Sequence, residues 1–221
     1  SDKNCTEEQI PLLESQIKTN YNKSPDLALI QMQELIQLYQ CSDAEHHKLG
    51  NTYLNMGTLY NEEKNKLDSA IIFLSKADAV FQKAKDTLGW ANILKYQGLV
   101  EVRAGDPQGL SKIQFGKDLY EAVNFQKGRM VAQQNEATAY FHLEDYRKAD
   151  SLLTPCLDFW NGEHIRWQYV FYDLMQLYEK SGDCTAFSKA KPQVMSYTDM
   201  LSVENMDRLE KLEISICQYK D

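Results

Sequence analysis

The sequence predicts an all-α fold in which antiparallel helix hairpins stack in chain order and a capping helix closes the C-terminal end. Two features of the chain support this. The 221 residues contain only 10 Gly and 5 Pro, and so few turn-forming residues indicate long regular elements rather than many short strands. Small and large side chains also recur in a fixed order about every 40 residues, and a period of this size is the signature of a helical repeat.

One copy of the repeat begins in the segment 53–60. There the large residue Tyr53 is followed four positions later by the small residue Gly57 and then by an aromatic residue. Downstream, Ala70, Leu74 and Ala77 give small, large and small residues at spacings of four and three. Antiparallel helices approach within about 8–10 Å where one offers a small residue and the other a large one. This segment therefore predicts a closely packed pair of helices.

Further copies of the pattern lie before and after this segment. The best has the turn Glu144-Asp145-Tyr146, and the copy around Gly98 is degenerate. The residues that carry these copies are Ala28, Met32 and Leu35; Gly98, Gly109, Ile113 and Gly116; Ala137, Tyr140, Tyr146, Ala149, Leu153 and Cys156; and Met175 and Tyr178 with the turn 181–183. Several copies in register are strong evidence for a repeat architecture.

On these residues the chain resembles the tetratricopeptide repeat family over nearly its whole length. It is most similar to the longer-unit branch found in bacterial regulators and motor-adaptor proteins. The resemblance implies a right-handed α-solenoid of about five helix hairpins. It also implies that the first helix of each hairpin lines a concave face, where its outward residues contact a bound polypeptide.

The predicted layout is a single domain over residues 1–221. Its hairpins cover about 6–41, 44–85, 86–124, 126–159 and 162–197, and the capping helix covers 198–220. The individual helices are expected at 6–21, 25–40, 44–62, 66–84, 86–104, 107–124, 126–142, 146–159, 162–181 and 184–197. Leu209, Leu212 and Ile216 form one apolar stripe in the capping helix, and solenoids need such a cap for solubility.

Prolines and aspartates mark several helix ends. Pro25 and Pro107 are expected in first helical turns, where a missing N–H costs nothing. Asp106 and Asp183 lie near helix starts, where a carboxylate complements the helix dipole. Pro192 falls inside the predicted tenth helix and is expected to kink or end it.

Charge and hydropathy exclude two classes of partner. The net charge is −8 and the isoelectric point is about 5.1, without a run of Lys and Arg, so the sequence does not predict binding to nucleic acid or to anionic membranes. No apolar stretch approaches the roughly 18 residues of a membrane-spanning helix. The expected partner is a protein or a peptide, and the sequence does not indicate an oligomeric state.

The sequence predicts neither an enzyme nor a metal or cofactor site. It lacks a nucleophile elbow, a phosphate-binding loop and a dinucleotide fingerprint. His46 and His47 are adjacent and point about 100° apart on a helix, so they cannot share one metal ion. His142 and His164 are single residues that are typical of a surface or a turn.

The five cysteines allow two interpretations. In antiparallel packing, the start of one helix lies beside the end of the next, and Cys5 with Cys41, and Cys184 with Cys217, occupy such places. We predict two disulfides that join these pairs at the two ends of the solenoid. The alternative is that all five cysteines, including Cys156 at a small-residue packing site, are reduced and buried.

The disulfides bear on the compartment. Disulfide bonds persist in oxidising surroundings, so they favour an extracytoplasmic location, either periplasmic or tethered to a membrane. If the cysteines are reduced, a cytoplasmic location is equally consistent with the sequence. The chain opens at Ser1 without an initiator Met, which we interpret as a processed or trimmed form.

The family resemblance assigns a set of peptide-binding residues to the concave face. They are Asn51, Leu54, Thr58, Asn61 and Glu62; Asn92, Lys95, Leu99 and Arg103; Gln134, Thr138, Phe141 and His142; and Tyr169, Tyr172 and Gln176. Leu54 and Thr58 stand where the carboxylate-clamping branch of the family has Lys and Asn, so that clamp is not expected here. The alternative for each residue is a solvated inner-face position without a binding role.

Three functions are consistent with these observations, in decreasing order of support. The first is a non-enzymatic protein-binding scaffold, as the sensory or assembly part of a longer signalling protein. The second is a small-ligand or peptide-sensing receptor whose groove closes on binding. The third is an enzyme, which would require a deep pocket holding a group with a strongly perturbed pKa.

Overall fold

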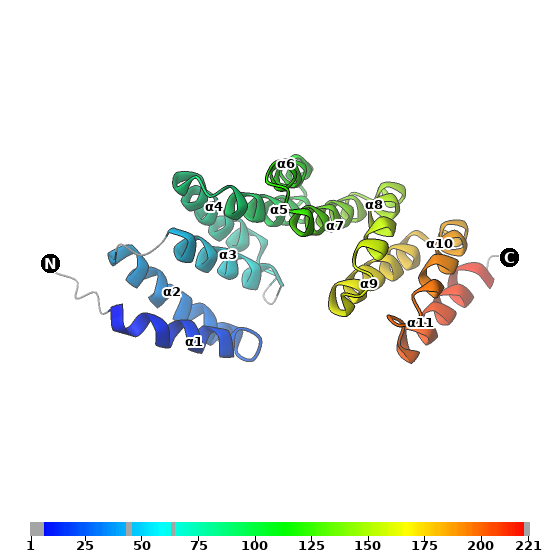
Figure 1. Ribbon diagram of the computed structural model, residues 1–221, viewed down its shortest axis with the longest axis horizontal. Helices are drawn as coiled ribbons and strands as arrows, with labels where there is room; N and C mark the ends of the chain where they lie inside the picture. The colour runs from blue at the N-terminus through cyan, green and yellow to red at the C-terminus, as the bar shows by residue number, and fades with distance from the viewer. Residues whose placement is uncertain (1–6, 43–45, 63–64, 219–221) are drawn as a thin grey trace. The chain divides into compact units, whose positions relative to one another are not determined.

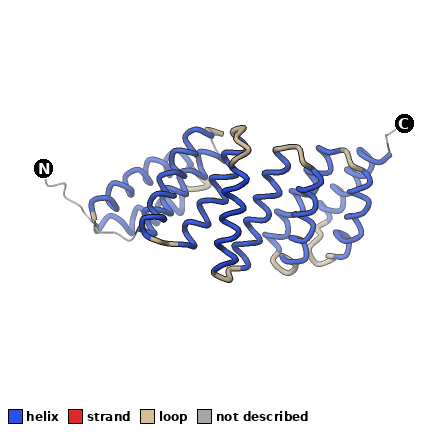
Figure 2. Tube along the Cα trace, turned by 90° about the horizontal axis from the view of Figure 1, so that it is seen from above, coloured by secondary structure: helices blue, strands red, loops and turns tan. Residues whose placement is uncertain are grey.

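The computed structural model describes residues 7–42, 46–62 and 65–218, which form eleven α-helices and no strand (Figures 1 and 2). The helices are α1 (Ile10–Asn20), α2 (Pro25–Cys41), α3 (His46–Glu62), α4 (Leu67–Ala84), α5 (Thr87–Arg103), α6 (Gly109–Ala122), α7 (Gln126–His142), α8 (Tyr146–Phe159), α9 (His164–Ser181), α10 (Cys184–Ser196) and α11 (Val203–Glu213). A 3-10 turn, Glu7–Gln9, precedes α1, and a π-helix, Ile214–Gln218, continues α11. The all-α class and the order of helices are as the sequence predicts.

The chain divides into two compact units, Ser1–Arg129 and Met130–Asp221. The first unit has a hydrophobic core that extends from Leu13 to Val100, and the second has its own core from Met130 to Ile216. The two are therefore described separately, and the single domain expected from the sequence stays a prediction.

In the first unit, helices pair in chain order. α1 packs on α2, α3 on α4 and α5 on α6, while α2–α3 and α4–α5 contacts join successive hairpins. Gly57 sits where the repeat pattern places a small residue: a Cβ there would lie 2.7 Å from Leu74 Cγ. Ala70 and Ala77 are fully buried on either side of Leu74. The small–large–small pattern thus sets the close approach of α3 and α4.

The degenerate repeat brings two helix backbones into direct contact. A Cβ on Gly98 of α5 would lie 2.2 Å from the carbonyl oxygen of Gly109 of α6, and the reverse distance is also 2.2 Å. Further along the same pair of helices, a Cβ on Gly116 would lie 2.9 Å from the carbonyl oxygen of Ala91. Glycine replaces the usual alanine in this copy because the two backbones touch.

The second unit is centred on α9, which contacts α8, α10 and α11. Its core contains the fully buried side chains of Trp167 and Phe171 together with Trp160. The sequence left open whether these aromatics form a core or a peptide-binding hot spot; for these three, burial decides for the core. Cys156 is a buried thiol in the same cluster, with its Sγ 3.5 Å from Met130 Sδ.

Helix ends follow the sequence signals at some positions and depart from them at two. Pro25 opens α2, and the carboxylate of Asp183 caps α10 by accepting a 2.9 Å bond from the Ala186 N–H. Pro107 was expected in a first helical turn but lies two residues before α6, which begins at Gly109. Pro192 was expected to kink or end α10; the helix does not end there but continues to Ser196. Pro192 is exposed, so water can bond the carbonyl that the ring deprives of its partner.

The C-terminal cap is held to α10 by a disulfide. Cys184, at the start of α10, is bonded to Cys217 in the π-helix, with a Cα separation of 5.1 Å. This is the pairing proposed from the sequence, and a Lys191–Glu213 ion pair accompanies it. The cap begins later than expected, at Val203, because Ser202 and Asn205 form a capping box there. Cys5 lies outside the described residues, so the Cys5–Cys41 pair stays a prediction.

Candidate protein-binding groove

A groove of about 500 Å³ runs between α1 and α3 in the first unit, with α2 beneath it. Its lining residues are Glu14, Ile17, Lys18, Tyr21 and Asn22 from α1 and the turn after it; Met32, Leu35 and Tyr39 from α2; and Lys48, Asn51, Thr52 and Asn55 from α3. α1 and α3 are the first helices of successive hairpins. The groove therefore lies on the face that the family resemblance assigns to ligand binding.

The floor of the groove is apolar. Ile17, Met32 and Leu35 lie there, and all three belong to the buried core of the first unit. Its rim is polar. The rim contains two ammonium groups and three amides but one carboxylate, so it carries more hydrogen-bond donors than acceptors. The exposed side chains of Lys18 and Asn55 have no partner among the described residues. Such a surface suits a segment that buries an apolar side chain and hydrogen-bonds along its main chain.

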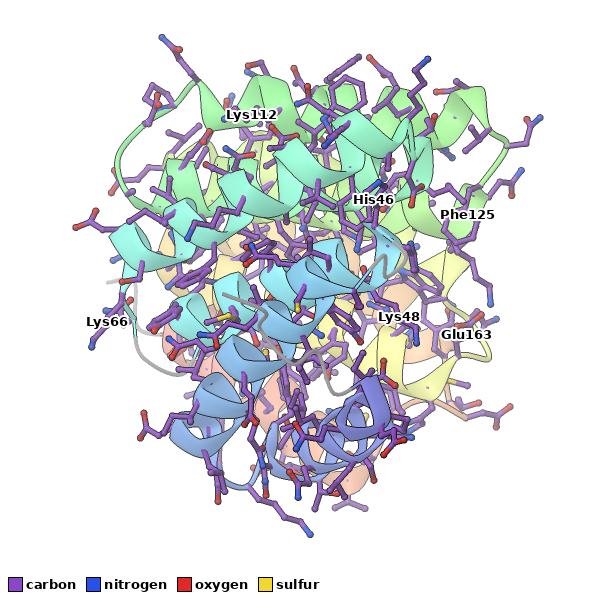
Figure 3. All side chains as sticks on the ribbon, turned by 90° about the vertical axis from the view of Figure 1, so that its left-hand side faces the viewer. His46, Lys48, Lys66, Lys112, Phe125 and Glu163 are labelled. Atoms are coloured by element: carbon purple, nitrogen blue, oxygen red, sulfur yellow. A yellow bond between two sulfur atoms is a disulfide. The ribbon has the colours of Figure 1, made fainter. Side chains whose placement is uncertain are left out.

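A hydrogen-bond network around Glu14 lines part of the groove. The Tyr39 hydroxyl donates to Glu14 Oε1 at 2.5 Å, and Lys48 Nζ lies 3.2 Å from the same oxygen (Figure 3 labels Lys48). The bond from Tyr39, followed by that from Lys48, holds the pKa of Glu14 below its usual value despite partial burial. Burial and the adjacent carboxylate raise the pKa of Tyr39. The network joins α1, α2 and α3 and keeps Glu14 ionised.

The rim residue Asn51 is positioned from outside the groove. Its Nδ2 lies 2.9 Å from Nε2 of His47, whose Nδ1 lies 3.1 Å from Oδ2 of Asp86. Burial opposes ionisation of Asp86, but bonds from the Gly89 N–H and from His47 outweigh it and lower the pKa of this carboxyl. Asp86 also caps α5, so the capping residue of one hairpin fixes a rim amide of the preceding one.

In the first unit, the predicted binding residues divide between the groove and internal contacts. Asn51 lines the groove. The Thr58 hydroxyl donates to the Leu54 carbonyl, and Asn61 accepts a 2.5 Å bond from Arg103. On α5, Asn92 accepts a bond from the Tyr120 hydroxyl, and Leu99 is half-buried.

Two of these residues were expected to face a ligand and do not. Leu54 is buried in the core of the first unit because its position on α3 faces inward. Lys95 is buried as well, with its Nζ 3.4 Å from the Tyr120 hydroxyl and 4.8 Å from the Tyr96 ring centre. Their expected exposure is therefore wrong. Glu62, also expected there, is exposed at the end of α3.

In the second unit, the predicted residues lie on α7 and α9. Thr138, Phe141 and Gln176 line a small cavity of about 20 Å³ beside Asp173. Gln134 was expected to be exposed but is buried, and its Nε2 donates to Asp173 at 2.6 Å. Burial raises the pKa of Asp173, and the bond from Gln134 partly opposes this.

The remaining predicted residues of this unit differ in accessibility. Tyr169 is 57% exposed on α9, and His142 is exposed at the end of α7. Tyr172 is half-buried beneath Arg208, whose guanidinium carbon lies 5.1 Å from the ring centre. Ile165, one turn before Tyr169, is also exposed and was not predicted. Ile165 and Tyr169 therefore form a short exposed apolar stripe on α9.

Sequence reasoning missed most of the groove. The residues of α1, among them Glu14 and Lys18, were not included in the predicted face, nor was Asn55 of α3. A signal was available: positions 14 and 18 share one face of the first helix of the first hairpin. Applying the concave-face rule to that hairpin would have selected them. The bond between Tyr39 and Glu14 connects two helices and has no local signal.

The described residues show neither a metal-binding cluster nor a membrane span. No group of three His, Cys, Asp or Glu side chains among them is placed to hold a metal ion. Within residues 7–42, 46–62 and 65–218, no helix combines the length and apolarity needed to cross a bilayer.

Comparison with solved structures shows the same fold. A kinesin light chain-like protein of Podosopora anserina with nearly identical TPR-like repeats aligns over 96% of this chain and 98% of its own, with a TM-score of 0.58 and 11% identity. A single-substitution variant of that protein gives a TM-score of 0.60 at the same identity. BtubC (BKLC) from P. vanneervenii aligns over 100% of this chain and 95% of its own, with a TM-score of 0.56 and 14% identity.

At the level of sequence, no protein-family profile and no curated protein matches the chain. The likeness to the solved structures nevertheless extends over nearly the full length of both partners, and it agrees with the repeat pattern in the sequence. The chain therefore has the tetratricopeptide-like α-solenoid fold.

Proposed function

We propose that the chain is a non-enzymatic protein-binding scaffold, and that the groove between α1 and α3 holds a segment of its partner. The observation that carries the proposal is the groove itself: an apolar floor from Ile17, Met32 and Leu35 beneath a rim of amides and lysines. Asparagine side chains both donate and accept, so they can pair with a peptide main chain whatever its sequence. The floor then selects an apolar side chain.

The charge of the rim adds a preference. Glu14 is bonded to Lys48, which leaves the ammonium group of Lys18 uncompensated among the described residues. An acidic side chain next to the apolar one would complete the contact. The rest of the molecule, with a net charge of −8, would repel acidic segments elsewhere on its surface. We therefore expect the bound segment to combine an aliphatic and an acidic residue.

The test is a selection of random peptides displayed on phage, followed by calorimetry with the enriched peptides. Asn55→Arg, which places a large side chain over the floor, should weaken binding about tenfold or more. Lys83→Glu, an exposed change on α4, is the matched control and should leave the affinity unchanged. Peptides that bind both variants equally, or a selection that enriches none, would contradict the proposal.

The runner-up function is a receptor that senses a small ligand or a peptide, and its small-ligand form is distinguished by the same variants. A groove of about 500 Å³ falls within the range of small-molecule sites. A small-ligand receptor would show no enrichment of peptides, and a small molecule held in the groove would raise the melting temperature of the parent chain but not of Asn55→Arg.

We also propose that the protein works outside the cytoplasm, within a longer signalling or assembly protein. The support is the Cys184–Cys217 disulfide, since reducing compartments disfavour such bonds. A thiol count on denatured, unreduced protein from its natural host checks it. With Cys184–Cys217 and the predicted Cys5–Cys41 pair both joined, one of the five cysteines remains as a thiol. A count of five would contradict the proposal.

A further inference from the structure

Within the described part of the first unit, the first hairpin has an outer face that α3 to α6 leave exposed. One side of α1 and α2 faces the groove and α3. The opposite side is formed by Leu12, Gln16 and Asn20 from α1 and by Leu27 and Gln31 from α2. Leu12 is 61% exposed and Leu27 is 45% exposed. We name these five residues the terminal face. The hairpin that carries them is at the N-terminal end of the chain in Figure 1 and is nearest the viewer in Figure 3.

A chain of amides crosses the terminal face. Asn20 Nδ2 donates to Gln31 Oε1 at 3.1 Å, and Gln31 Nε2 donates to Gln16 Oε1 at 3.0 Å. Within the described residues, this leaves Gln16 Nε2 as a donor at one end and Asn20 Oδ1 as an acceptor at the other. Reversing all three amides would exchange the two ends but would still leave one donor and one acceptor. The face is therefore polarised along α1, with opposite hydrogen-bonding groups one helical turn apart.

Such a face is complementary to itself. A two-fold axis that crosses α1 between Gln16 and Asn20 brings the free donor of each copy to the free acceptor of the other. In the antiparallel hairpin, Leu12 lies at the end away from the α1–α2 turn and Leu27 at the end near it. The same two-fold axis places Leu12 of each copy at the end of the interface where Leu27 of the other copy lies. The side chains of Leu12 and Leu27 therefore also meet.

The charges around the terminal face agree with the same axis. Glu34 extends the α2 stripe beyond Gln31, and Lys23 stands in the α1–α2 turn. Neither side chain has an ion-pair partner among the described residues of its own chain. The axis moves Glu34 of one copy toward the turn of the other, where Lys23 lies. Opposite charges would thus meet twice in the pair, whereas the net charge of −8 on each chain would oppose contact through most other surfaces.

We propose that the terminal face is an isologous interface through which two copies of this chain associate. The occupant is a second copy because the amide chain, the leucines and the Glu34 and Lys23 charges all find their complements under one two-fold axis. The interface uses the side of the first hairpin away from the groove. It leaves both grooves of the pair open to partners, and it does not depend on the proposed function.

The association is tested by sedimentation velocity on the full 221-residue chain, from low micromolar to submillimolar concentration. The parent chain should shift from monomer to dimer over this range. Leu12→Glu should raise the dissociation constant about tenfold or more, while Val203→Glu, at an 88% exposed position on α11, should leave it unchanged. A parent chain that stays monomeric throughout, or equal weakening by both variants, overturns the proposal.

Exchanging the charges of Glu34 and Lys23 tests the proposed two-fold axis. Glu34→Lys alone and Lys23→Glu alone should each weaken the dimer, because each brings like charges together twice. The double variant should restore association, since the opposite charges then meet with their signs exchanged. Both positions are exposed, so circular dichroism should show unchanged helix content in all three variants. Failure of the double variant to restore the dimer overturns the two-fold pairing.

Discussion

Glu14 is the residue at which the three helices around the groove converge. It lies on α1, accepts a bond from Tyr39 on α2 and pairs with Lys48 on α3. Because its pKa in the folded chain is below the ordinary value, its ionised form stabilises the fold. This contribution is present above the unfolded pKa of about 4.3 and is lost as the pH falls through the lower folded pKa. The side chain is partly exposed, so the contribution is modest.

Removing the Tyr39 hydroxyl should move the Glu14 pKa upward. In Tyr39→Phe, the main group that lowers this pKa is gone, and the value should rise toward that of an ordinary Glu. A titration followed by carbon-13 NMR of the carboxyl group measures it. Lys48→Met is the comparison, and it should also raise this pKa, because Lys48 lowers it through a hydrogen bond and through its charge. A larger rise in Lys48→Met than in Tyr39→Phe would show that the ion pair dominates instead.

Among the helices, the α5–α6 pair shows how far glycine can bring two elements together. The carbonyl oxygens of Gly98 and Gly109 each occupy the space that a Cβ on the other would need. Since backbone atoms cannot rotate aside as a side chain can, even one methyl group forces the helices apart. The same contact fixes where Lys112 of α6 meets Glu101 of α5, whose charged atoms lie 2.5 Å apart.

The Gly98→Ala variant tests this contact, because the contact decides whether the substitution stabilises or destabilises the chain. In an open helix, the change would stabilise the chain by about 1 kcal/mol, because alanine favours the helix. Here we expect a loss of about 2 kcal/mol, which is typical of overpacking. Urea unfolding followed by circular dichroism measures the difference, and Asp118→Ala on α6, away from the α5 contact, should change stability little. A stabilised Gly98→Ala variant would mean that α5 and α6 can separate at no cost.

Across the molecule, stability should be local. The first and second units have separate clusters of buried residues, which include Phe81 in one and Phe171 in the other. In a repeat protein, each hairpin gains its stability chiefly from its neighbours, so damage in one region spreads over a limited distance. The chain should therefore open in parts rather than in one step.

Two matched substitutions check this locality. Phe81 and Phe171 are both fully buried, and truncating either to alanine should cost about 3–5 kcal/mol. Amide hydrogen exchange should accelerate in α3 and α4 for Phe81→Ala and in α9 and α10 for Phe171→Ala. Each variant is the control for the other. Equal acceleration across both units in either variant would indicate one cooperative fold.

The sequence predicted the fold better than it predicted the residues that line the groove. Asn51 was identified because it stands at the correct position of a first helix, whereas Leu54, at a neighbouring position, proved to be core. One residue of register on a helix rotates a side chain by about 100°, and the repeat pattern does not fix the register that finely. Lys95 and Gln134 were misjudged for another reason: a polar side chain is expected outside unless its buried partner is known, and those partners, Tyr120 and Asp173, are distant in sequence.

Local patterns in the chain were enough to specify the helices, their pairing and the repeat, because spacing along one helix and the alternation of small and large residues are local properties. Gly57, Ala70 and Leu74 already indicate which faces must meet. Folding in three dimensions was needed to select the residues that line the groove and those that oppose one another, such as Tyr39 with Glu14 and Gln16 with Gln31. Such pairs depend on how neighbouring helices are rotated and shifted, and these are set by the sum of many packing contacts rather than by any one motif.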